Sequence, residues 1–187
     1  MADLPAGLRL ELRTTDGLTA ADLARIRALM DLGWPDPDEA FDDDDWDHAL
    51  GGVHALVRDP GGRVLAHGSV VPRSLWIGDR AVAAGYVEAV ATHPAWRRRG
   101  LGSAVMTALA TVVRDRYELG CLGTGEDRFY ARLGWERWRG PSWVRRPGGP
   151  ERSPDEDGYL WVLRTPTGPP FTGDEPLTCE ERPGDDW

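Results

Sequence analysis

The chain has 187 residues, of which 41% are hydrophobic and 28% are charged, and its formal net charge is −9. This length suits one domain with its own core, and we treat residues 1–187 as a single domain. An acidic chain is a poor partner for nucleic acid, and no apolar run approaches the roughly 18 residues that a membrane span needs. The two cysteines, Cys121 and Cys179, indicate neither a disulfide framework nor a metal site. With no signal-peptide pattern at the N-terminus, we expect a cytoplasmic protein without metal, nucleic-acid or membrane partners.

The first part of the chain alternates between strand-like and helix-like patterns. Apolar residues at every second position predict a strand over Leu8–Arg13. An apolar face that recurs every three or four residues predicts a helix over Leu18–Leu32, with Thr19 as its N-cap. The acidic segment Asp36–Asp47 follows, and its charge favours a cationic ligand, although a solvated loop is the alternative. A short helix is expected at Asp45–Leu50.

The middle and the end of the chain predict a sheet with helices inserted between its strands. Strands are expected at Val53–Arg58, Arg63–Val71, Ser74–Ile77, Ala81–Ala91, Leu119–Leu122 and Tyr159–Arg164, and an extended Trp-rich stretch at Trp135–Trp143. Helices are expected from Leu101 to about Tyr117 and at Glu126–Leu133, with a loop at Pro147–Asp157 and a Pro-rich acidic tail after the last strand. This order of elements predicts a mixed α/β layer fold.

The stretch Gly85–Ser103 combines a strand, a bend and the start of a helix. Its strand is apolar around one carboxylate, Glu88, and it ends before Pro94, because the residue that precedes a proline is extended. Three arginines, Arg97–Arg99, and Gly100 then lead into the helix. Backbone N–H groups at a helix N-terminus attract an anion, and a glycine lets the anion approach the backbone. The alternative is a basic surface turn that only caps the helix.

The spacing of this loop resembles the pyrophosphate loop of GNAT-type N-acetyltransferases. Arg97, Gly100 and Gly102 fill the pattern R/Q-x-x-G-x-G/A, after an apolar strand and before an amphipathic helix. The resemblance implies the GNAT fold, with a central mixed and mostly antiparallel twisted sheet flanked by helices, and acetyl-CoA as the acyl donor. The residues that it implies as contacts of acetyl-CoA are Val90, Ala91, Thr92, Arg97, Arg98, Arg99, Gly100, Leu101, Gly102 and Ser103.

Stretches outside the loop resemble one GNAT branch, the aminoglycoside 2′-N-acetyltransferases. They are Asp45-Trp-x-His-x-Leu-Gly-Gly-x-His-Ala-Leu56, Gly85-Tyr-Val-Glu88, Leu133-Gly-Trp135, Trp138-x-Gly-Pro141, Pro154-x-x-Asp-Gly158 and Gly184-Asp-x-Trp187. The resemblance implies an enzyme that acetylates the 2′-amine of aminoglycoside antibiotics by direct attack in a ternary complex and so gives aminoglycoside resistance. It also implies a homodimer.

Amine acetylation needs a base for the ammonium proton and an acid for the departing thiolate. Glu88 is the candidate base, since burial in an apolar strand raises the proton affinity of a carboxylate. Tyr130 resembles the GNAT tyrosine that protonates the thiolate. The alternatives are a structural Glu88 paired with an arginine and a Tyr130 that only packs on its helix. Cys121 lies in an apolar run without a neighbouring base, so we expect a core thiol rather than a nucleophile.

An aminoglycoside carries several ammonium groups, which carboxylates bind through charge-assisted hydrogen bonds. The resemblance places such acids before Trp46, in the loop after Pro154 and at the terminal carboxylate, with the tail over about 172–187 packed at the substrate site. Carried over to this chain, the substrate-binding residues are Glu39, Asp42, Asp43, Glu88, Ala89, Gly123, Asp155, Glu156 and Trp187. Three departures from the family pattern affect this set. Ala40 replaces an acid, Ala89 replaces a glycine, and the loop Gly123-Thr124-Gly125 stands where the family tends to have serines.

Two other functions remain open. The first keeps the acetyltransferase but changes the amine, to another small polyamine or a protein amine. The second is a non-catalytic module that binds acyl-CoA or a drug. The presence of both Glu88 and Tyr130 speaks against the second function, because binding alone needs neither residue.

Overall fold

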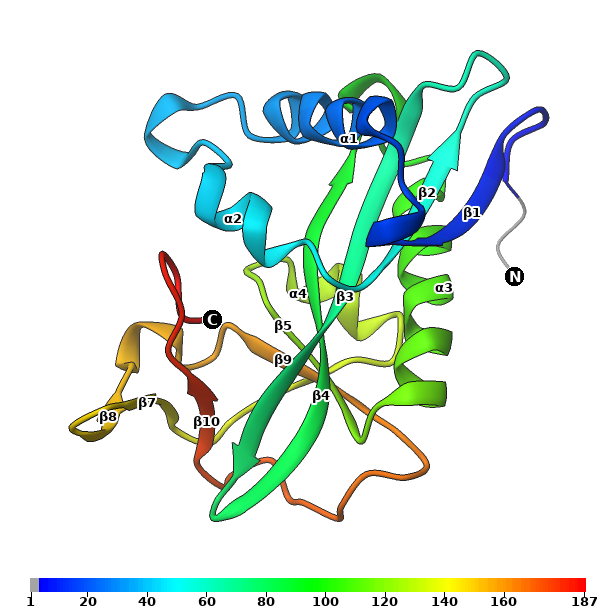
Figure 1. The fold of residues 1–187 in the computed structure, drawn as a ribbon. Coiled ribbons are helices and arrows are strands. Elements are labelled where there is room, and N and C mark those ends of the chain that lie inside the picture. Colours follow the sequence, from blue (N-terminus) through cyan, green and yellow to red (C-terminus); the bar gives the residue numbers. More distant parts are fainter. Residues whose placement is uncertain (1–3) are drawn as a thin grey trace. The chain divides into compact units, whose positions relative to one another are not determined.

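The computed structural model describes residues 4–187, apart from the side chain of Glu39. Its contacts divide the chain into a first compact unit, Met1–Val71 with Val87–Thr111, and a second, Pro72–Tyr86 with Val112–Trp187. Strands β3 (Val64–Ile77) and β4 (Arg80–Thr92) and helix α3 (Leu101–Arg116) contribute residues to both units (Figure 1). Each unit is described by itself.

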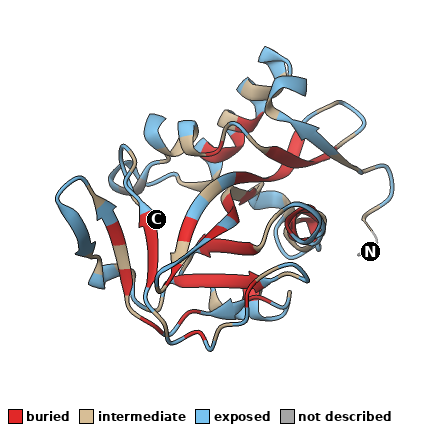
Figure 2. Ribbon diagram, turned by 60° about the horizontal axis from the view of Figure 1, so that its bottom comes forward, coloured by how far each residue is buried: buried red, intermediate tan, exposed pale blue. Residues whose placement is uncertain are grey.

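The first unit is built on an antiparallel sheet that is covered by helix α1. β1 (Arg9–Thr14) pairs with β2 (Val53–Arg58), and β2 pairs with the first half of β3. Helix α1 (Ala20–Gly33) buries the apolar face that the sequence predicts. Together with the sheet this face forms a core cluster of Ile26, Leu29, Met30, Leu56, Val64 and Ala91. Figure 2 shows β2 and the neighbouring part of β3 as buried.

Helix α1 follows the predicted N-cap Thr19, which forms a capping box with Asp22. The Thr19 hydroxyl accepts a hydrogen bond from the Asp22 N–H at 3.1 Å, and the Asp22 carboxylate accepts one from the Thr19 N–H at 3.0 Å. Asp22 also pairs with the buried Arg58 guanidinium at 2.8 Å. The hydrogen bonds from Thr19, and then the Arg58 charge, hold the pKa of Asp22 below its usual value. An N-cap of this kind contributes about 1 kcal/mol to stability.

The second unit contains a mixed sheet. Its strand order is β6 (Glu136–Arg137), β9 (Leu160–Arg164), β5 (Leu119–Gly123), β4, β3, β10 (Leu177–Glu180), β7 (Ser142–Arg146) and β8 (Gly149–Arg152). The pairs β4–β5 and β10–β7 are parallel, whereas β10–β3, β5–β9, β6–β9 and β7–β8 are antiparallel. Helix α4 (Asp127–Ala131) precedes β6. A mixed, mostly antiparallel sheet with helices confirms the predicted fold class.

The structure corrects three of the predicted elements. The predicted strands Arg63–Val71 and Ser74–Ile77 are one strand, β3, which continues through Pro72. The predicted loop Pro147–Asp157 contains β8, and the predicted tail contains β10. Since β10 lies between β3 and β7, the tail is part of the sheet.

Among residues 4–187, no three His, Cys, Asp or Glu side chains are grouped so that they could hold a metal ion. No helix in this range has both the length and the apolar character that crossing a bilayer requires. Cys121 and Cys179 are both buried. Cys121 lies within β5, where it has the core position that its apolar neighbours predict.

Candidate active site

The loop between β4 and α3 forms a backbone site for an anion in the first unit. The first hydrogen bond of α3 runs from the Ala104 N–H to the Gly100 carbonyl at 2.9 Å. The N–H groups of Leu101, Gly102 and Ser103 precede this bond and therefore have no acceptor within the helix. The first turn of α3 holds no acidic residue. A helix end of this kind attracts negative charge.

Two residues of this loop have left-handed backbone conformations. The φ angle is +82° at Gly100 and +61° at Arg98. A Cβ atom at position 100 would meet no atom within 4 Å, so the glycine serves the backbone conformation rather than a close contact. Arg97 donates from Nε to the Thr92 carbonyl at 3.4 Å, which places its guanidinium at the end of β4. The loop thus combines N–H groups that have no helical acceptor with positive charge, as the sequence predicts.

Glu88 and Ala89 occupy an irregular position of β4. Ala89 has a φ of +51°, a conformation that favours glycine and accounts for the glycine that is usual at this position of the family pattern. The Ala89 carbonyl accepts a hydrogen bond from His67 Nδ1 at 2.8 Å, and the Glu88 carbonyl accepts one from the Ser69 hydroxyl at 3.5 Å. The register that joins β4 to β5 ends at Tyr86, before both residues.

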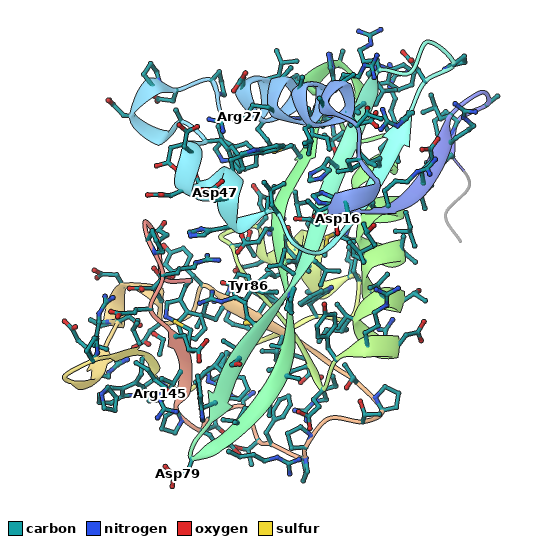
Figure 3. All side chains as sticks on the ribbon, viewed as in Figure 1. Asp16, Arg27, Asp47, Asp79, Tyr86 and Arg145 are labelled. Atoms are coloured by element: carbon teal, nitrogen blue, oxygen red, sulfur yellow. The ribbon has the colours of Figure 1, made fainter. Side chains whose placement is uncertain are left out.

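The acidic segment before β2 makes local hydrogen bonds and ion pairs. Helix α2 (Asp43–His48) begins two residues earlier than predicted, and the carboxylate of its N-cap, Asp42, accepts a hydrogen bond from the Asp45 N–H at 2.9 Å. Asp43 pairs at 3.0 Å with Arg27, which is labelled on α1 in Figure 3. Asp42 and Asp43, two of the three substrate contacts predicted in this segment, therefore also have a structural partner.

An acidic cavity of about 340 Å³ lies in the second unit. Its lining residues are Gly123, Thr124, Asp155, Glu156, Tyr159, Asp185 and Trp187. The sequence predicts four of these as substrate contacts and misses Thr124, Tyr159 and Asp185. The acidic composition of the tail is the signal that points to Asp185. No basic residue belongs to this lining, so the cavity favours a cation.

The carboxylates of the acidic cavity disfavour one another's charge. The pKa of Glu156 is raised above its usual value, first because the side chain is partly buried and then because of the charges of Asp185, Asp155 and Asp186. An ammonium group in the cavity would reduce this repulsion. The acidic cavity therefore suits a ligand that carries more than one ammonium group.

Asp157, the aspartate of the Pro-x-x-Asp-Gly stretch, does not line the acidic cavity. Its carboxylate pairs with Arg152 at 2.6 Å and accepts a hydrogen bond from the Ser142 hydroxyl at 2.7 Å. The hydrogen bond from Arg152 is the main reason why the pKa of Asp157 lies well below its usual value. Asp157 thus fixes the loop that presents Asp155 and Glu156 to the cavity.

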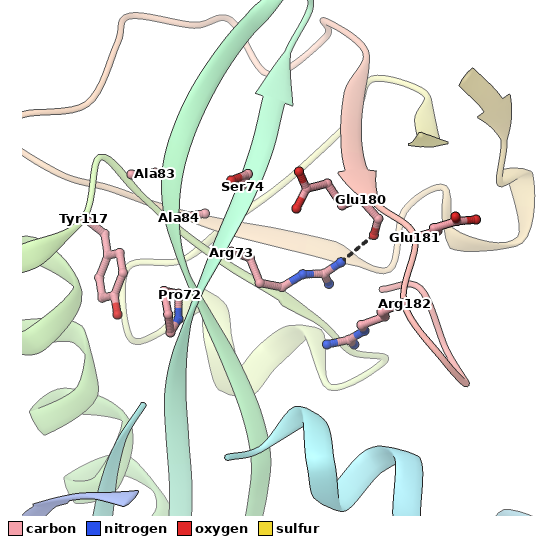
Figure 4. A pocket seen from close by; sticks show the side chains of 9 residues that line it. All are labelled: Pro72, Arg73, Ser74, Ala83, Ala84, Tyr117, Glu180, Glu181 and Arg182. Atoms are coloured by element: carbon pink, nitrogen blue, oxygen red, sulfur yellow. Dashed lines mark hydrogen bonds between the residues drawn. The ribbon is translucent and has the colours of Figure 1, made fainter. Parts of the chain in front are cut away.

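Arginines hold the chain end that supplies Trp187. Arg146 pairs with the Asp186 carboxylate at 2.7 Å, and Arg73 donates to the Asp186 carbonyl at 2.8 Å. Arg182 donates to the backbone oxygen of Trp187 at 3.0 Å. Figure 4 shows Arg73 and Arg182 at a second cavity, of about 370 Å³, beside β10. The tail is therefore fixed at the acidic cavity by several contacts.

Tyr130 lies on α4 in the second unit and is buried. Burial, and then the charge of Glu126, raise the pKa of Tyr130 to about 12, so its hydroxyl keeps its proton at neutral pH. The ring makes edge-to-face contacts with Phe129 at 4.9 Å and Trp135 at 6.3 Å between centroids. Tyr130 therefore keeps the proton that a general acid needs. Its ring also packs against its neighbours, as the alternative of a purely structural tyrosine predicts.

Comparisons with known proteins agree with this geometry. The acetyltransferase (GNAT) domain family matches residues 14–138. An aminoglycoside 2′-N-acetyltransferase from Mycolicibacterium fortuitum is 42% identical over 151 residues, which are 79% of this chain and 77% of that protein. The chain belongs to the aminoglycoside 2′-N-acetyltransferase family. The family named by the sequence motifs is thereby confirmed.

Solved structures confirm the fold of this aminoglycoside 2′-N-acetyltransferase family member. A GNAT family N-acetyltransferase from Escherichia coli in complex with CoA is 17% identical, with a TM-score of 0.62 over 96% of this chain and 93% of that chain. A GNAT family acetyltransferase from Brucella melitensis in complex with acetyl-CoA is 17% identical, with a TM-score of 0.59 over 90% and 94%. At these identities the likeness establishes the GNAT fold.

The predicted site residues of this aminoglycoside 2′-N-acetyltransferase family member fall into two groups. The first unit contains Asp42, Asp43, Glu88, Ala89, Val90, Ala91, Thr92 and the loop 97–103, and the second contains Gly123, Tyr130, Asp155, Glu156 and Trp187. Within the second unit the structure brings the predicted substrate contacts to one cavity, whose lining does not include Tyr130. The Glu39 side chain lies outside the described residues. The roles of all these residues stay predictions.

Proposed function

We propose that this chain transfers the acetyl group of acetyl-CoA to the 2′-amine of aminoglycosides and so gives resistance to them. The observation that carries the proposal is the acidic cavity, where Asp155, Glu156, Asp185 and Trp187 line one space. An aminoglycoside offers several ammonium groups to such a cavity. The name of the relative from Mycolicibacterium fortuitum supports the same substrate class.

The loop before α3 fits the pyrophosphate of acetyl-CoA. Leu101, Gly102 and Ser103 offer N–H groups without helical acceptors, and the arginines at 97–99 add positive charge. The pantetheine arm would pair with the backbone of Val90–Thr92 like an added strand, past the end of the β4–β5 register. Bound acetyl-CoA supplies the thioester carbonyl and the thiol leaving group.

Replacing Gly100 by Ala is expected to raise the KM for acetyl-CoA about tenfold or more, because an N–H bond to a charged group contributes about 1.5–3 kcal/mol. A φ of +82° is unfavourable for alanine, so the loop would relax away from the conformation that presents the N–H groups at the start of α3. Gly62 is the matched control, because it has the same φ and the same open surroundings but lies in the turn before β3. Equal KM values in Gly100→Ala and Gly62→Ala would contradict the anion site.

Glu88 and Tyr130 are proposed to move the two protons of the reaction. The attacking amine is protonated at neutral pH, and Glu88 takes its proton, directly or through a water molecule. The amine then attacks the thioester carbonyl, whose oxygen the Val90 N–H stabilises as charge develops. Tyr130 gives its proton to the departing thiolate, and the second proton that the nitrogen loses as the amide forms restores the Tyr130 hydroxyl. No covalent enzyme intermediate is required, in agreement with the buried position of Cys121.

Replacing Tyr130 by Phe is expected to lower kcat about 10- to 100-fold, because the thiolate then departs without a proton donor. The phenyl ring keeps the contacts with Phe129 and Trp135. Thermal unfolding should therefore change little. Tyr117→Phe is the matched control, because burial also raises the pKa of Tyr117, which has no proposed role in the reaction. A kcat in Tyr130→Phe equal to that of Tyr117→Phe would leave Tyr130 with packing alone.

A cytoplasmic homodimer is part of the proposal. The resemblance to the family supports it, and light scattering coupled to size-exclusion chromatography measures the mass in solution. A mass near 20.6 kDa, that of one chain, would contradict the dimer. The acetylation chemistry does not depend on the outcome.

Thiol release from acetyl-CoA tests the proposed function. The amines are a set of aminoglycosides and a set of linear polyamines that carry similar positive charge. We expect kcat/KM to be at least about 100-fold higher for aminoglycosides, since a shaped site discriminates by more than charge. Comparable values for both sets would favour the acetyltransferase for another amine. Tight acetyl-CoA binding without thiol release from either set would favour the non-catalytic module.

A further inference from the structure

Two buried histidines of the first unit have no part in the roles proposed above. His54 on β2 and His67 on β3 are both 0% exposed, and His54 Nδ1 lies 3.0 Å from His67 Nε2. The outer nitrogens also have partners. His54 Nε2 lies 2.8 Å from the Thr15 hydroxyl, and His67 Nδ1 lies 2.8 Å from the Ala89 carbonyl. We call this chain of hydrogen bonds from Thr15 to Ala89 the histidine relay.

The position of each hydrogen in the histidine relay follows from its Ala89 end. A carbonyl can only accept, so His67 Nδ1 carries a hydrogen. Burial lowers the pKa of His54 to about 4 and that of His67 to about 3, so both rings are neutral at pH 7 and carry one hydrogen each. His67 Nε2 therefore accepts a hydrogen bond from His54 Nδ1. His54 Nε2 in turn accepts the hydrogen of the Thr15 hydroxyl.

The Thr15 end completes the histidine relay. The Thr15 hydroxyl oxygen accepts hydrogen bonds from the N–H groups of Gly51 at 2.9 Å and Gly52 at 3.2 Å. Its own hydrogen has His54 Nε2 at 2.8 Å as the nearer acceptor, against 3.4 Å for the Gly52 carbonyl. Every nitrogen of both imidazoles is thus satisfied, as full burial requires. Moving the hydrogen of either imidazole to the other nitrogen of the same ring would place two donors or two acceptors opposite each other.

The histidine relay ends on a strained residue. Ala89 has a φ of +51°, and a residue with a side chain keeps such a conformation only where its surroundings fix it. The Ala89 carbonyl and the Val90 N–H belong to the same planar peptide group and point in opposite directions. A hydrogen bond that fixes the carbonyl therefore also fixes the direction of the Val90 N–H.

We propose that the histidine relay is a positioning device, in which His67 sets the direction of the Val90 N–H and holds the backbone next to Glu88. The identity of the thioester oxygen as the target of that N–H rests on the proposed function. The relay itself rests on the geometry of the first unit. His67 is a positioning residue, because the contacts described for its ring are to protein groups.

The tautomers of the two histidines test the relay without any substrate. Nitrogen chemical shifts of the imidazoles in the 15N-labelled full chain at pH 7 distinguish an Nδ1–H from an Nε2–H ring. We expect Nδ1–H tautomers at both His54 and His67. An Nε2–H tautomer or a charged ring at His67 would overturn the proposal. This measurement does not depend on which amine, if any, the enzyme acetylates.

Two variants separate positioning from folding. Asparagine at position 67 can place an N–H donor near the position of Nδ1, whereas leucine has no donor. We expect His67→Leu to lower kcat about 10- to 100-fold, because small misplacements in an active site have effects of this size. The kcat of His67→Asn should stay closer to that of the wild type. Adding Ala89→Gly to His67→Leu should restore part of the kcat, because glycine adopts a positive φ without strain.

The kinetic comparison is made below the unfolding temperature of every variant, at matched folded fraction. Equal losses in His67→Leu and His67→Asn, together with no recovery from Ala89→Gly, would show that His67 only supports folding. A wild-type enzyme that acetylates no amine would contradict the proposed function instead, and the tautomers would still decide the relay.

Discussion

Replacing Glu88 by Gln is expected to lower kcat by about 10²- to 10⁴-fold and to leave the KM for acetyl-CoA unchanged. Glutamine matches the shape of glutamate, but its amide does not accept the proton of the ammonium group. The Ser69 hydroxyl bonds to the Glu88 backbone carbonyl, which the substitution does not alter. Steady-state kinetics with saturating aminoglycoside, measured across a range of pH, checks the prediction. The fall of kcat toward acid pH should be weaker in the variant than in the wild type.

Glu151→Gln is the charge-matched control for this substitution. Glu151 is exposed on β8 and pairs with Arg146 at 3.3 Å, so its loss should cost at most about 1 kcal/mol of stability and leave kcat unchanged. If Glu88→Gln showed the kcat and the acid limb of the wild type, Glu88 could not be the base. A loss of acetyl-CoA binding in Glu88→Gln would point to the structural alternative.

Replacing Glu156 by Gln is expected to raise the KM for the aminoglycoside about 10- to 100-fold, with little change in kcat. A charge-assisted hydrogen bond in a partly buried site contributes about 1.5–3 kcal/mol, and the neutral amide loses most of it. The same Glu151→Gln control removes one negative charge outside the acidic cavity. An unchanged KM for the amine would show that Glu156 does not contact the substrate.

The pH dependence of this KM follows from the raised pKa of Glu156. As the pH falls through that pKa, the carboxyl group takes up a proton and loses its attraction for the ammonium group. The KM for the amine should therefore rise toward acid pH in the wild type. In Glu156→Gln, which has no proton to take up, the part of the rise that is due to Glu156 should be absent.

Deleting Trp187 should act on the same KM. The deletion removes one residue from the lining of the acidic cavity, together with the indole N–H that bonds to the Ser153 hydroxyl at 3.1 Å. We expect a higher KM for the amine and an unchanged KM for acetyl-CoA. An unaltered KM for the amine would exclude the terminal residue as a substrate contact.

The elements with strong local signals could be predicted from the sequence. The bounds of β2 (Val53–Arg58) were predicted correctly because its apolar run lies between glycines and a turn. Helix α1 was predicted over Leu18–Leu32 and runs over Ala20–Gly33, directly after the predicted N-cap Thr19. The short strand β10 could not be predicted, since its four residues gain their stability from pairing with β3 and β7, which are distant in the sequence. β3 was divided at Pro72, although the strand pairs with β2 before that residue and with β10 after it.

The part of the candidate site that lies near the end of the sequence could be predicted, because the family motifs extend that far. Asp155, Glu156 and Trp187, which are predicted to bind the substrate, line one cavity. Asp185 lines it too but was not predicted, although it lies in the Gly184-Asp-x-Trp187 motif. The left-handed backbone of Ala89 could not be read from an alanine. The Ala89 carbonyl accepts a hydrogen bond from His67, which lies 22 positions earlier in the sequence.

The measurement that tests the central claim most directly uses two aminoglycosides that differ only at the 2′ carbon, one with an amine and one with a hydroxyl group. Thiol release and the mass of the product are followed with acetyl-CoA in excess. We predict one acetyl group on the 2′-amine compound, located on the 2′ nitrogen by NMR, and no acetylation of the 2′-hydroxyl compound. Equal acetylation of both compounds would contradict the proposed position of the reaction, because the amine used would then lie elsewhere on the molecule.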